Sequence, residues 1–251
     1  MKKGLQLWWL FFLLMNVFFS FAQIKTKEIT KQYQAWVSIN STARISNRWG
    51  FSADLHERRN NFLKDPSFYF ARAGLNYWIK DNIILAAGYA HMWVASAVAN
   101  RKIFTNENRI YQQVQMTSKI SKLSSFQRLR TEQRWQQKIV DNKITGQNKF
   151  TVRIRYLLSL TVPVIKNTRY PSLVLSDELC VQFGKEIVYN TFDQNRVFLG
   201  VKQKLTKDFS FDLGYMLVKQ KKSTGYQYDV NETFRCFFYY LPDWRKNKMH
   251  S

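Results

Sequence analysis

The chain contains few of the residues that interrupt or cross-link small folds. Its 251 residues include 2 cysteines, 4 prolines and 9 glycines. This content excludes a disulfide-rich scaffold, a collagen-like repeat and a low-complexity linker protein. The 3 histidines and 2 cysteines lack the spacing of a zinc site, and no glycine-rich phosphate loop occurs. We therefore expect neither a metal nor another cofactor.

Long apolar runs are also absent, except at the N-terminus. Lys2 and Lys3 precede the apolar run at residues 5–22, in which Ser20 and Ala22 occupy the small-residue positions before a cleavage site. This layout is typical of a secretory signal peptide, and the alternative is an uncleaved membrane anchor. We expect a signal peptide over residues 1–22 and an exported domain over residues 23–251.

What the chain does have is aromatic residues and a period of two. It contains 20 Phe, 13 Tyr and 8 Trp, and polar and apolar positions alternate along most of its length. Such alternation places the two sets on opposite faces of β-strands. The alternation predicts eleven strands, at residues 32–45, 48–58, 67–80, 83–94, 108–120, 123–137, 148–162, 172–184, 194–205, 208–219 and 230–241.

The spacing of these runs favours a membrane-spanning barrel. Most are long enough to cross a bilayer as tilted strands, for which about nine to eleven residues suffice. Tight turns are predicted after the first, third, fifth and ninth runs, and longer polar loops after the second, fourth, sixth and tenth. Outer-membrane barrels alternate short turns and long loops in this way. The fold class predicted is all-β, a single antiparallel up-and-down transmembrane β-barrel, and the alternative is a soluble periplasmic β-sandwich.

Eleven strands conflict with the even number usual in bacterial single-chain barrels, whose two ends both lie in the periplasm. Residues 23–31 (QIKTKEITK) could supply a further strand before the first run. We therefore expect twelve strands, with ten as the fallback.

Charged residues on the polar faces are the main candidate site. If they share one lumen, they could form an anion-preferring pore or a ligand site, because arginine rings favour negative solutes. The competing interpretation is a structural Arg–carboxylate network that fills a narrow barrel. Glu132, alone among three arginines on its strand, is expected to accept several hydrogen bonds. The candidates are Asp54, Arg58, Arg72, Arg128, Arg130, Glu132, Arg134, Arg153, Arg155, Glu178 and Arg196, with Arg235 a further polar-face arginine.

Three smaller features bear on function. The segment KEIVYNTFDQNR (185–196) could bind a polar ligand at the barrel mouth or simply form a turn. His56 shares a polar face with Asp54, and His91 lies on an apolar face, but no serine stands in a nucleophile motif that either could serve. Cys180 and Cys236 fall on opposite faces of their strands, so we expect free thiols.

The charge balance suggests an anionic partner. Lys and Arg number 39 against 17 Asp and Glu, a net charge of +22. Nucleic acid is the usual partner of such a chain, but the export signal argues against it. We expect outer-membrane lipids or lipopolysaccharide instead, bound through phosphates. The basic residues assigned to loops and turns include Arg58, Arg59, Lys64, Arg101, Lys102, Lys219, Lys221 and Lys222.

Several segments together resemble a known family. They are SNRWGFSADLHERR (46–59), DNIILAAGYAH (81–91), RLRTEQRW (128–135) and FGKEIVYNTFDQNRVFLGV (183–201). The ordered series is similar to exported proteins of Bacteroidetes that are catalogued as domain of unknown function 2490. The resemblance covers about residues 30–242 and implies a barrel in the outer membrane of a Gram-negative bacterium, with no assigned activity.

The predicted function is therefore an outer-membrane β-barrel of structural, porin-like or lipid-interacting type, with an Arg/Glu-lined interior and no enzymatic activity. The alternatives are an outer-membrane lipid hydrolase and a soluble periplasmic binding protein.

Overall fold

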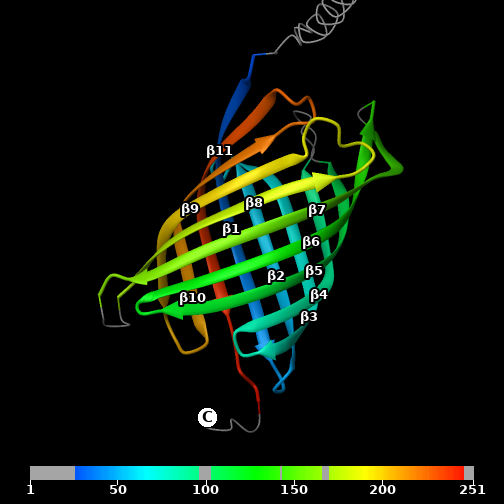
Figure 1. The fold of residues 1–251 in the computed structure, drawn as a ribbon. Helices are drawn as coiled ribbons and strands as arrows, with labels where there is room; N and C mark the ends of the chain where they lie inside the picture. Colours follow the sequence, from blue (N-terminus) through cyan, green and yellow to red (C-terminus); the bar gives the residue numbers. More distant parts are fainter. Residues whose placement is uncertain (1–25, 96–102, 142, 166–169, 246–251) are drawn as a thin grey trace, which may run out of the picture.

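A computed structural model describes residues 26–95, 103–141, 143–165 and 170–245 (Figure 1). The predicted signal peptide lies outside these residues. The described chain is all-β, and it contains no helix long and apolar enough to cross a membrane. Its eleven strands are β1 (Glu28–Arg44), β2 (Trp49–Asn60), β3 (Asp65–Lys80), β4 (Ile83–Ala95), β5 (Phe104–Ile120), β6 (Leu123–Val140), β7 (Lys143–Pro163), β8 (Ser172–Phe183), β9 (Phe192–Lys204), β10 (Phe209–Lys221) and β11 (Gln227–Tyr240).

The strands form one closed barrel in which each pairs with its sequence neighbours in antiparallel fashion. The ring is closed by β1 and β11, which run parallel from the Glu28–Gln227 pair to the Ser41–Tyr240 pair. All eleven predicted strands are present, but the expectation of twelve is wrong. Residues 28–31 extend β1 instead of forming a strand of their own, because they continue its pairing with β11.

An odd number of strands places the two ends of the barrel chain far apart. β1 begins at one end of the barrel, which we call the upper end, and β11 ends at the other, which we call the lower end (Figure 1). The expectation that both chain ends share one side is therefore wrong.

The predicted tight turns are present at the lower end, where residues 45–48, 81–82, 121–122 and 205–208 connect strands. The longer loop predicted after the sixth run is wrong, because Val140 at the end of β6 pairs with Lys143 at the start of β7. Ile139 pairs with Ile144 in a two-stranded hairpin that continues beyond the pairing of β7 with β8, which starts at Val152. The segment is polar because both of its faces meet water, not because its strands end. The connection after β2 is also short, at residues 61–64.

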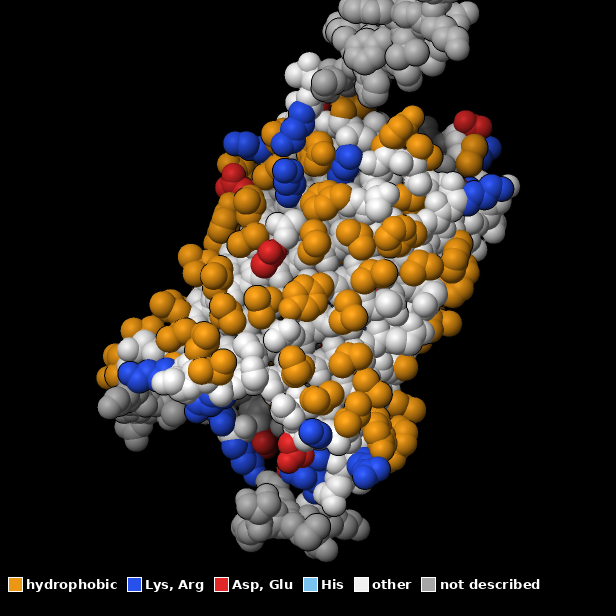
Figure 2. Space-filling view, in the orientation of Figure 1, with side chains coloured by type: hydrophobic (Ala, Val, Ile, Leu, Met, Phe, Trp, Pro, Cys, Tyr) orange, Lys and Arg blue, Asp and Glu red, His pale blue; other side chains and the backbone are white. Residues whose placement is uncertain are grey.

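The wall of the barrel is apolar on the outside. Leu55, Leu75 and Leu199 lie in the middle of their strands, yet 62%, 65% and 59% of their surfaces are exposed. On the face shown in Figure 2, hydrophobic side chains are distributed along the whole wall, and most Lys and Arg lie near the two ends. This distribution is the reverse of a water-soluble fold, in which large exposed apolar patches are rare.

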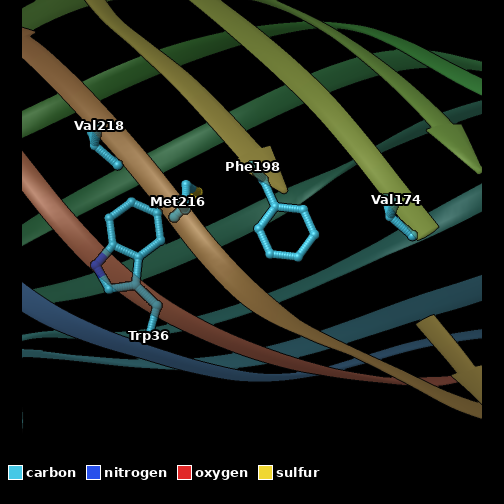
Figure 3. Packing of buried hydrophobic residues seen from close by; sticks show 5 residues of the cluster. All are labelled: Trp36, Val174, Phe198, Met216 and Val218. Carbon is cyan, nitrogen blue, oxygen red and sulfur yellow. The ribbon is translucent and has the colours of Figure 1, made fainter. Parts of the chain in front are cut away.

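Part of the interior is filled by apolar side chains. Trp36, Val174, Phe198, Met216 and Val218 form a buried cluster contributed by β1 and β8–β10 (Figure 3). These residues alternate with the outward-facing leucines and valines of the same strands. The cluster fills part of the barrel interior, and the rest of the interior is lined mainly by polar side chains.

Glycines on the inner face make room for large rings. A Cβ atom at Gly74 would lie 2.1 Å from the hydroxyl oxygen of Tyr111, and one at Gly88 would lie 2.9 Å from a carbon of the same ring. The Tyr111 ring therefore lies close against Gly74 and Gly88, where a Cβ atom would clash with it. This arrangement, in which an aromatic ring covers a glycine of a neighbouring strand, also pins strand register.

Candidate functional site

An internal cavity of about 1300 Å³ runs through the barrel. All but one of the predicted site residues line it directly, namely Asp54, Arg58, Arg72, Arg128, Arg130, Arg134, Arg153, Arg155, Glu178 and Arg196, and so does Arg235. Glu132 is 2% exposed and lies among the guanidinium groups that line the cavity. The alternation of the strands thus brings predicted residues from β2, β3, β6–β9 and β11 to one space.

Around β5–β9 the lining is an ion-pair network, which we call the charged sector. Seven arginines share four carboxylates there, so three positive charges are left in excess. Its members are Glu107, Arg109, Arg128, Arg130, Glu132, Arg134, Arg153, Arg155, Glu178, Asp193 and Arg196.

Glu132 is the centre of this sector. Its Oε2 accepts hydrogen bonds from Nη2 and Nε of Arg153, at 2.6 and 2.9 Å, and from Nη1 of Arg109 at 3.4 Å. Its Oε1 accepts one from Nη1 of Arg155 at 2.8 Å. Arg130 lies 3.7 Å away and donates instead to the side-chain oxygen of Gln113. One carboxylate thus balances several guanidinium groups in a confined space, where charge-assisted hydrogen bonds are strong.

Glu178 has the same role two strands further on, in β8. It accepts from Nη2 of Arg155, Nη2 of Arg128 and Nη1 of Arg196, at 2.8, 2.6 and 2.8 Å. Four strands, β6 to β9, therefore meet at this carboxylate. Both oxygens are fully used, so Glu178 offers no acceptor to a further cation.

Around β1–β3 arginine is accommodated differently, in what we call the aromatic sector, made of Trp36, His56, Arg58, Phe68 and Phe70. The guanidinium carbon of Arg58 lies 3.2 Å from the ring centre of Trp36 and 4.3 Å from that of Phe68. Within the described chain Arg58 forms no ion pair or hydrogen bond, and its Nε is buried without an acceptor. Its charge is therefore stabilised by ring faces alone.

Two further pairs complete the lining. Arg72 donates to Asp54 through Nε at 2.6 Å, and its guanidinium lies 5.1 Å from the ring centre of Tyr111. Asp212 accepts from Nη2 of Arg235 at 2.8 Å and from the hydroxyl of Tyr239 at 2.6 Å. The lower part of the cavity is lined mainly by uncharged side chains, which include Asn40, Thr42, Thr117, Ser124, Ser159, Thr161 and Ser176.

Sequence reasoning missed three members of the charged sector. Glu107 lies before the predicted start of the fifth run at residue 108, because β5 begins at Phe104, whereas Arg109 lies within the predicted run. Glu107 accepts from Nε of Arg109 and of Arg134, at 2.7 and 2.8 Å. The alternation in the sequence could have identified both residues, because Glu107 and Arg109 are spaced two residues apart in line with the inward-facing Tyr111. Asp193 was assigned to a loop, but it lies in β9 and accepts from Nη1 of Arg153 at 3.1 Å.

The side chains of segment 185–196 do not share one side of the barrel wall. Asp193, Gln194 and Arg196 line the cavity, whereas the side chain of Asn195 faces outward and donates to the carboxylate of Asp177. Glu186 is exposed at the upper end and accepts from Nζ of Lys138 at 2.8 Å. This hydrogen bond lowers the pKa of the Glu186 carboxyl. The polar residues of this segment therefore do not form one binding site.

The histidines and thiols lie in separate environments. His56 faces the cavity between the rings of Phe70 and Phe237, with centroid distances of 5.0 and 5.8 Å. His91 faces outward and interacts with Asn106 and Asn108. Cys180 is buried and Cys236 half-buried, and both thiols are free, as predicted. Among the described residues no group of three or more His, Cys, Asp or Glu could hold a metal ion.

The basic residues assigned to loops lie mostly at the upper end. Arg59 and Lys64 flank the β2–β3 turn, and Lys219, Lys221 and Lys222 lie where β10 ends. Arg58 is an exception, because it faces the cavity. Arg101 and Lys102 lie outside the described residues.

Comparison with known proteins identifies a family but no characterised relative. No curated protein matches the chain. One family model, described as a protein of unknown function (DUF2490), matches residues 33–246, a range that contains nearly the whole barrel and every cavity-lining charge described above. The chain belongs to this family of proteins of unknown function.

Proposed function

We propose that the protein is an outer-membrane β-barrel of a Gram-negative bacterium, exported by a signal peptide over residues 1–22. Its role is structural or porin-like, without enzymatic activity, and its interior restricts the passage of solutes. The observation that carries this proposal is the distribution of side chains across the wall, with leucines exposed outside and arginines and glutamates buried inside.

The dimensions support this assignment. The strands contain 12 to 21 residues, and about nine to eleven residues suffice for a tilted strand to cross the hydrocarbon layer. All backbone groups of a closed barrel are paired between strands, as the absence of water in lipid requires. The surplus length of the strands would extend into water at the upper end, where the β6–β7 hairpin projects.

The interior supports a restricted pore. Barrels of about eight strands are filled by side chains, and those of about sixteen leave an open channel. The charged sector places eleven ionisable side chains across the interior of an eleven-stranded barrel. We expect a small conductance that prefers anions, because arginines outnumber carboxylates along the cavity.

Cell fractionation combined with heat modifiability tests the proposal. A folded outer-membrane barrel should sediment with the outer membrane and migrate faster on a gel before boiling than after it. The mature protein should begin at Gln23 by intact mass. Recovery in the soluble periplasmic fraction without detergent would instead favour the soluble alternative. Release of fatty acid from phospholipid by the folded protein would favour the lipid hydrolase.

A second role, binding of lipopolysaccharide, is favoured by the position of Arg59, Lys64, Lys219, Lys221 and Lys222 at one end of the barrel. If the tight turns face the periplasm, this end faces outward, toward the lipid phosphates. Binding should weaken as salt rises, because these charges are exposed to solvent. Salt-insensitive binding would contradict this role.

A further inference from the structure

The described interior carries more positive charge than its carboxylates neutralise, and the excess is not spread evenly. In the charged sector each arginine has a carboxylate within 4 Å. Asp54 is bound to Arg72, and Asp212 to Arg235. Arg58 is the inward-facing guanidinium of the described chain that has no acidic partner. We propose that Arg58 is the core of a binding site in the cavity for a phosphate-class oxyanion.

The two aromatic rings around Arg58 cover the faces of its guanidinium group and leave only the edges of that group free. Trp36 and Phe68 are its register partners on the two neighbouring strands, and their rings lie 3.2 and 4.3 Å from its guanidinium carbon. Stacking on rings engages the face of a guanidinium, whereas its five N–H donors lie in its plane. The two rings hold the Arg58 side chain in place, and no protein acceptor engages its N–H donors. Its hydrogen-bonding capacity is therefore unused.

Further donors line the same cavity. His56 is the next inward-facing residue of β2, and its Nε2 is buried without a partner. The Nε of Arg128 is likewise buried without a partner. Arg196 shares the indole of Trp36 with Arg58, and its guanidinium carbon lies 5.3 Å from the ring centre. Asp54, the inward-facing carboxylate of β2, is occupied by Arg72, and the adjacent Glu57 faces outward and pairs with Arg59. The groups around Arg58 thus offer hydrogen-bond donors and positive charge.

These donors suit a phosphate better than a simple halide. The edge of a guanidinium matches two oxygens of an oxyanion in a bidentate contact, which chloride cannot make. A phosphate group has further oxygens for His56 and for a second arginine, whereas a carboxylate is used up by one such contact. The ligand is therefore a phosphate group, either as the free ion or as a small phosphate ester such as a lipid headgroup.

This inference deepens the proposed function, because it rests on an interior that solutes can enter. It is independent of where the barrel resides, since binding can be measured in detergent. A failure of binding would leave the outer-membrane assignment intact, and a failure of fractionation would leave the binding site intact.

The experiment is a calorimetric titration of the folded full-length protein in detergent with inorganic phosphate, at constant ionic strength. Arg58→Gln is compared with Arg48→Gln, which removes the same charge from an exposed residue in the turn between β1 and β2. We expect saturable binding to the wild type, a loss of at least about tenfold for Arg58→Gln, and a change within about twofold for Arg48→Gln. Equal affinities of the wild type and Arg58→Gln, or no saturable binding to the wild type, would overturn the proposal.

Two additions keep the test decisive. Arg58→Lys retains the charge but not the bidentate edge, so it should bind phosphate several-fold more weakly, and it decides the matter if Arg58→Gln does not fold. Unchanged affinity in Arg58→Lys at equal heat stability would also overturn the proposal. Glycerol 1-phosphate in place of phosphate separates the two sources, since tighter binding of the ester indicates a headgroup and tighter binding of the free ion indicates phosphate.

Discussion

The two sectors of the barrel interior bury arginine in different ways. In the charged sector, Arg153 and Arg155 use their N–H donors on the carboxylates of Glu132 and Glu178. In the aromatic sector, Arg58 lies between two rings and uses none. Both arrangements stabilise a buried guanidinium group, but only the aromatic sector leaves its N–H donors available to a ligand.

The difference separates stability from binding. A shared carboxylate ties several strands together: Glu132 holds arginines of β5 and β7, and Glu178 holds arginines of β6, β7 and β9. A ring face stabilises the charge of an arginine but occupies none of its hydrogen-bond donors. We therefore expect changes in the charged sector to affect mainly unfolding, and changes at Arg58 to affect mainly ligand binding.

The largest expected effect comes from Glu132→Gln. Loss of this charge leaves Arg153, Arg155 and Arg109 facing one another in a confined space where water screens them poorly, which should cost about 3–5 kcal/mol of unfolding free energy. The measurement is the temperature at which the folded band on a gel converts to the unfolded band. Glu28→Gln is the control, because exposed Glu28 accepts a hydrogen bond from Gln227 at the start of β1. Equal midpoints would show that the charged sector does not stabilise the barrel.

A smaller effect is expected in the aromatic sector. Trp36→Leu removes the ring shared by Arg58 and Arg196 and leaves a gap in the cluster with Phe198 and Met216. We expect a loss of about 3 kcal/mol in urea unfolding, and about half of that for Trp36→Phe, which keeps a ring. If the two variants lose the same stability, volume alone matters at this position, and the ring face does not support Arg58.

The boundary between the sectors can be tested at Gly74. Tyr111 lies there between Arg72 and Arg130, whose guanidinium carbons are 5.1 and 5.2 Å from its ring centre. Gly74→Ala should cost about 2 kcal/mol, because the new methyl group would lie 2.1 Å from the Tyr111 hydroxyl oxygen. Gly146→Ala is the control, since a Cβ at Gly146 meets no atom within 4 Å.

A double variant sharpens this test. The hydroxyl of Tyr111 is buried without a partner, so Tyr111→Phe alone should not destabilise the barrel. Combined with Gly74→Ala it should recover part of the loss. Additive effects would show that the hydroxyl is not the atom that the methyl group displaces.

The smallest expected effect concerns the thiols. Cys180 lies inside, on the face of Glu178, and Cys236 lies on the opposite side of the wall from Arg235. Reduction should therefore leave the mass of the intact protein unchanged. A gain of about two mass units would reveal a disulfide and contradict the assignment of faces on β8 and β11.

The sequence contained the strands but not the way in which the barrel closes. Alternation located all eleven strands, because an inner polar face and an outer apolar face leave a period of two wherever the wall is continuous. It failed in the β6–β7 hairpin, where a register shift between Gln137 and Ile139 interrupts the alternation and both faces are exposed. The even number of strands was inferred from other barrels and not from this sequence. Nothing local in the β1 sequence distinguishes a parallel partner strand from an antiparallel one.

The candidate site was predictable as a set of charges but not as a set of pairs. Alternation placed Arg128, Arg130 and Glu132 on one face. The link between Glu178 and Arg128 joins residues 50 positions apart, and it depends on strand register, because both residues pair with Leu157 of the strand between them. The role of Arg58 depends on Phe68 and Trp36 from neighbouring strands, so no single segment revealed it.

The parallel seam between β1 and β11 also bears on how the barrel folds. Each hairpin closes over a turn of a few residues, but Glu28 and Gln227 are 199 positions apart. Ring closure over that length costs about 5 kcal/mol of chain entropy, against about 1 for a tight turn. The successive hairpins can therefore zip up in order as a curved ribbon before its edges meet. The seam is the last part of the wall to form, and in thermal fluctuations we expect it to be the first to part.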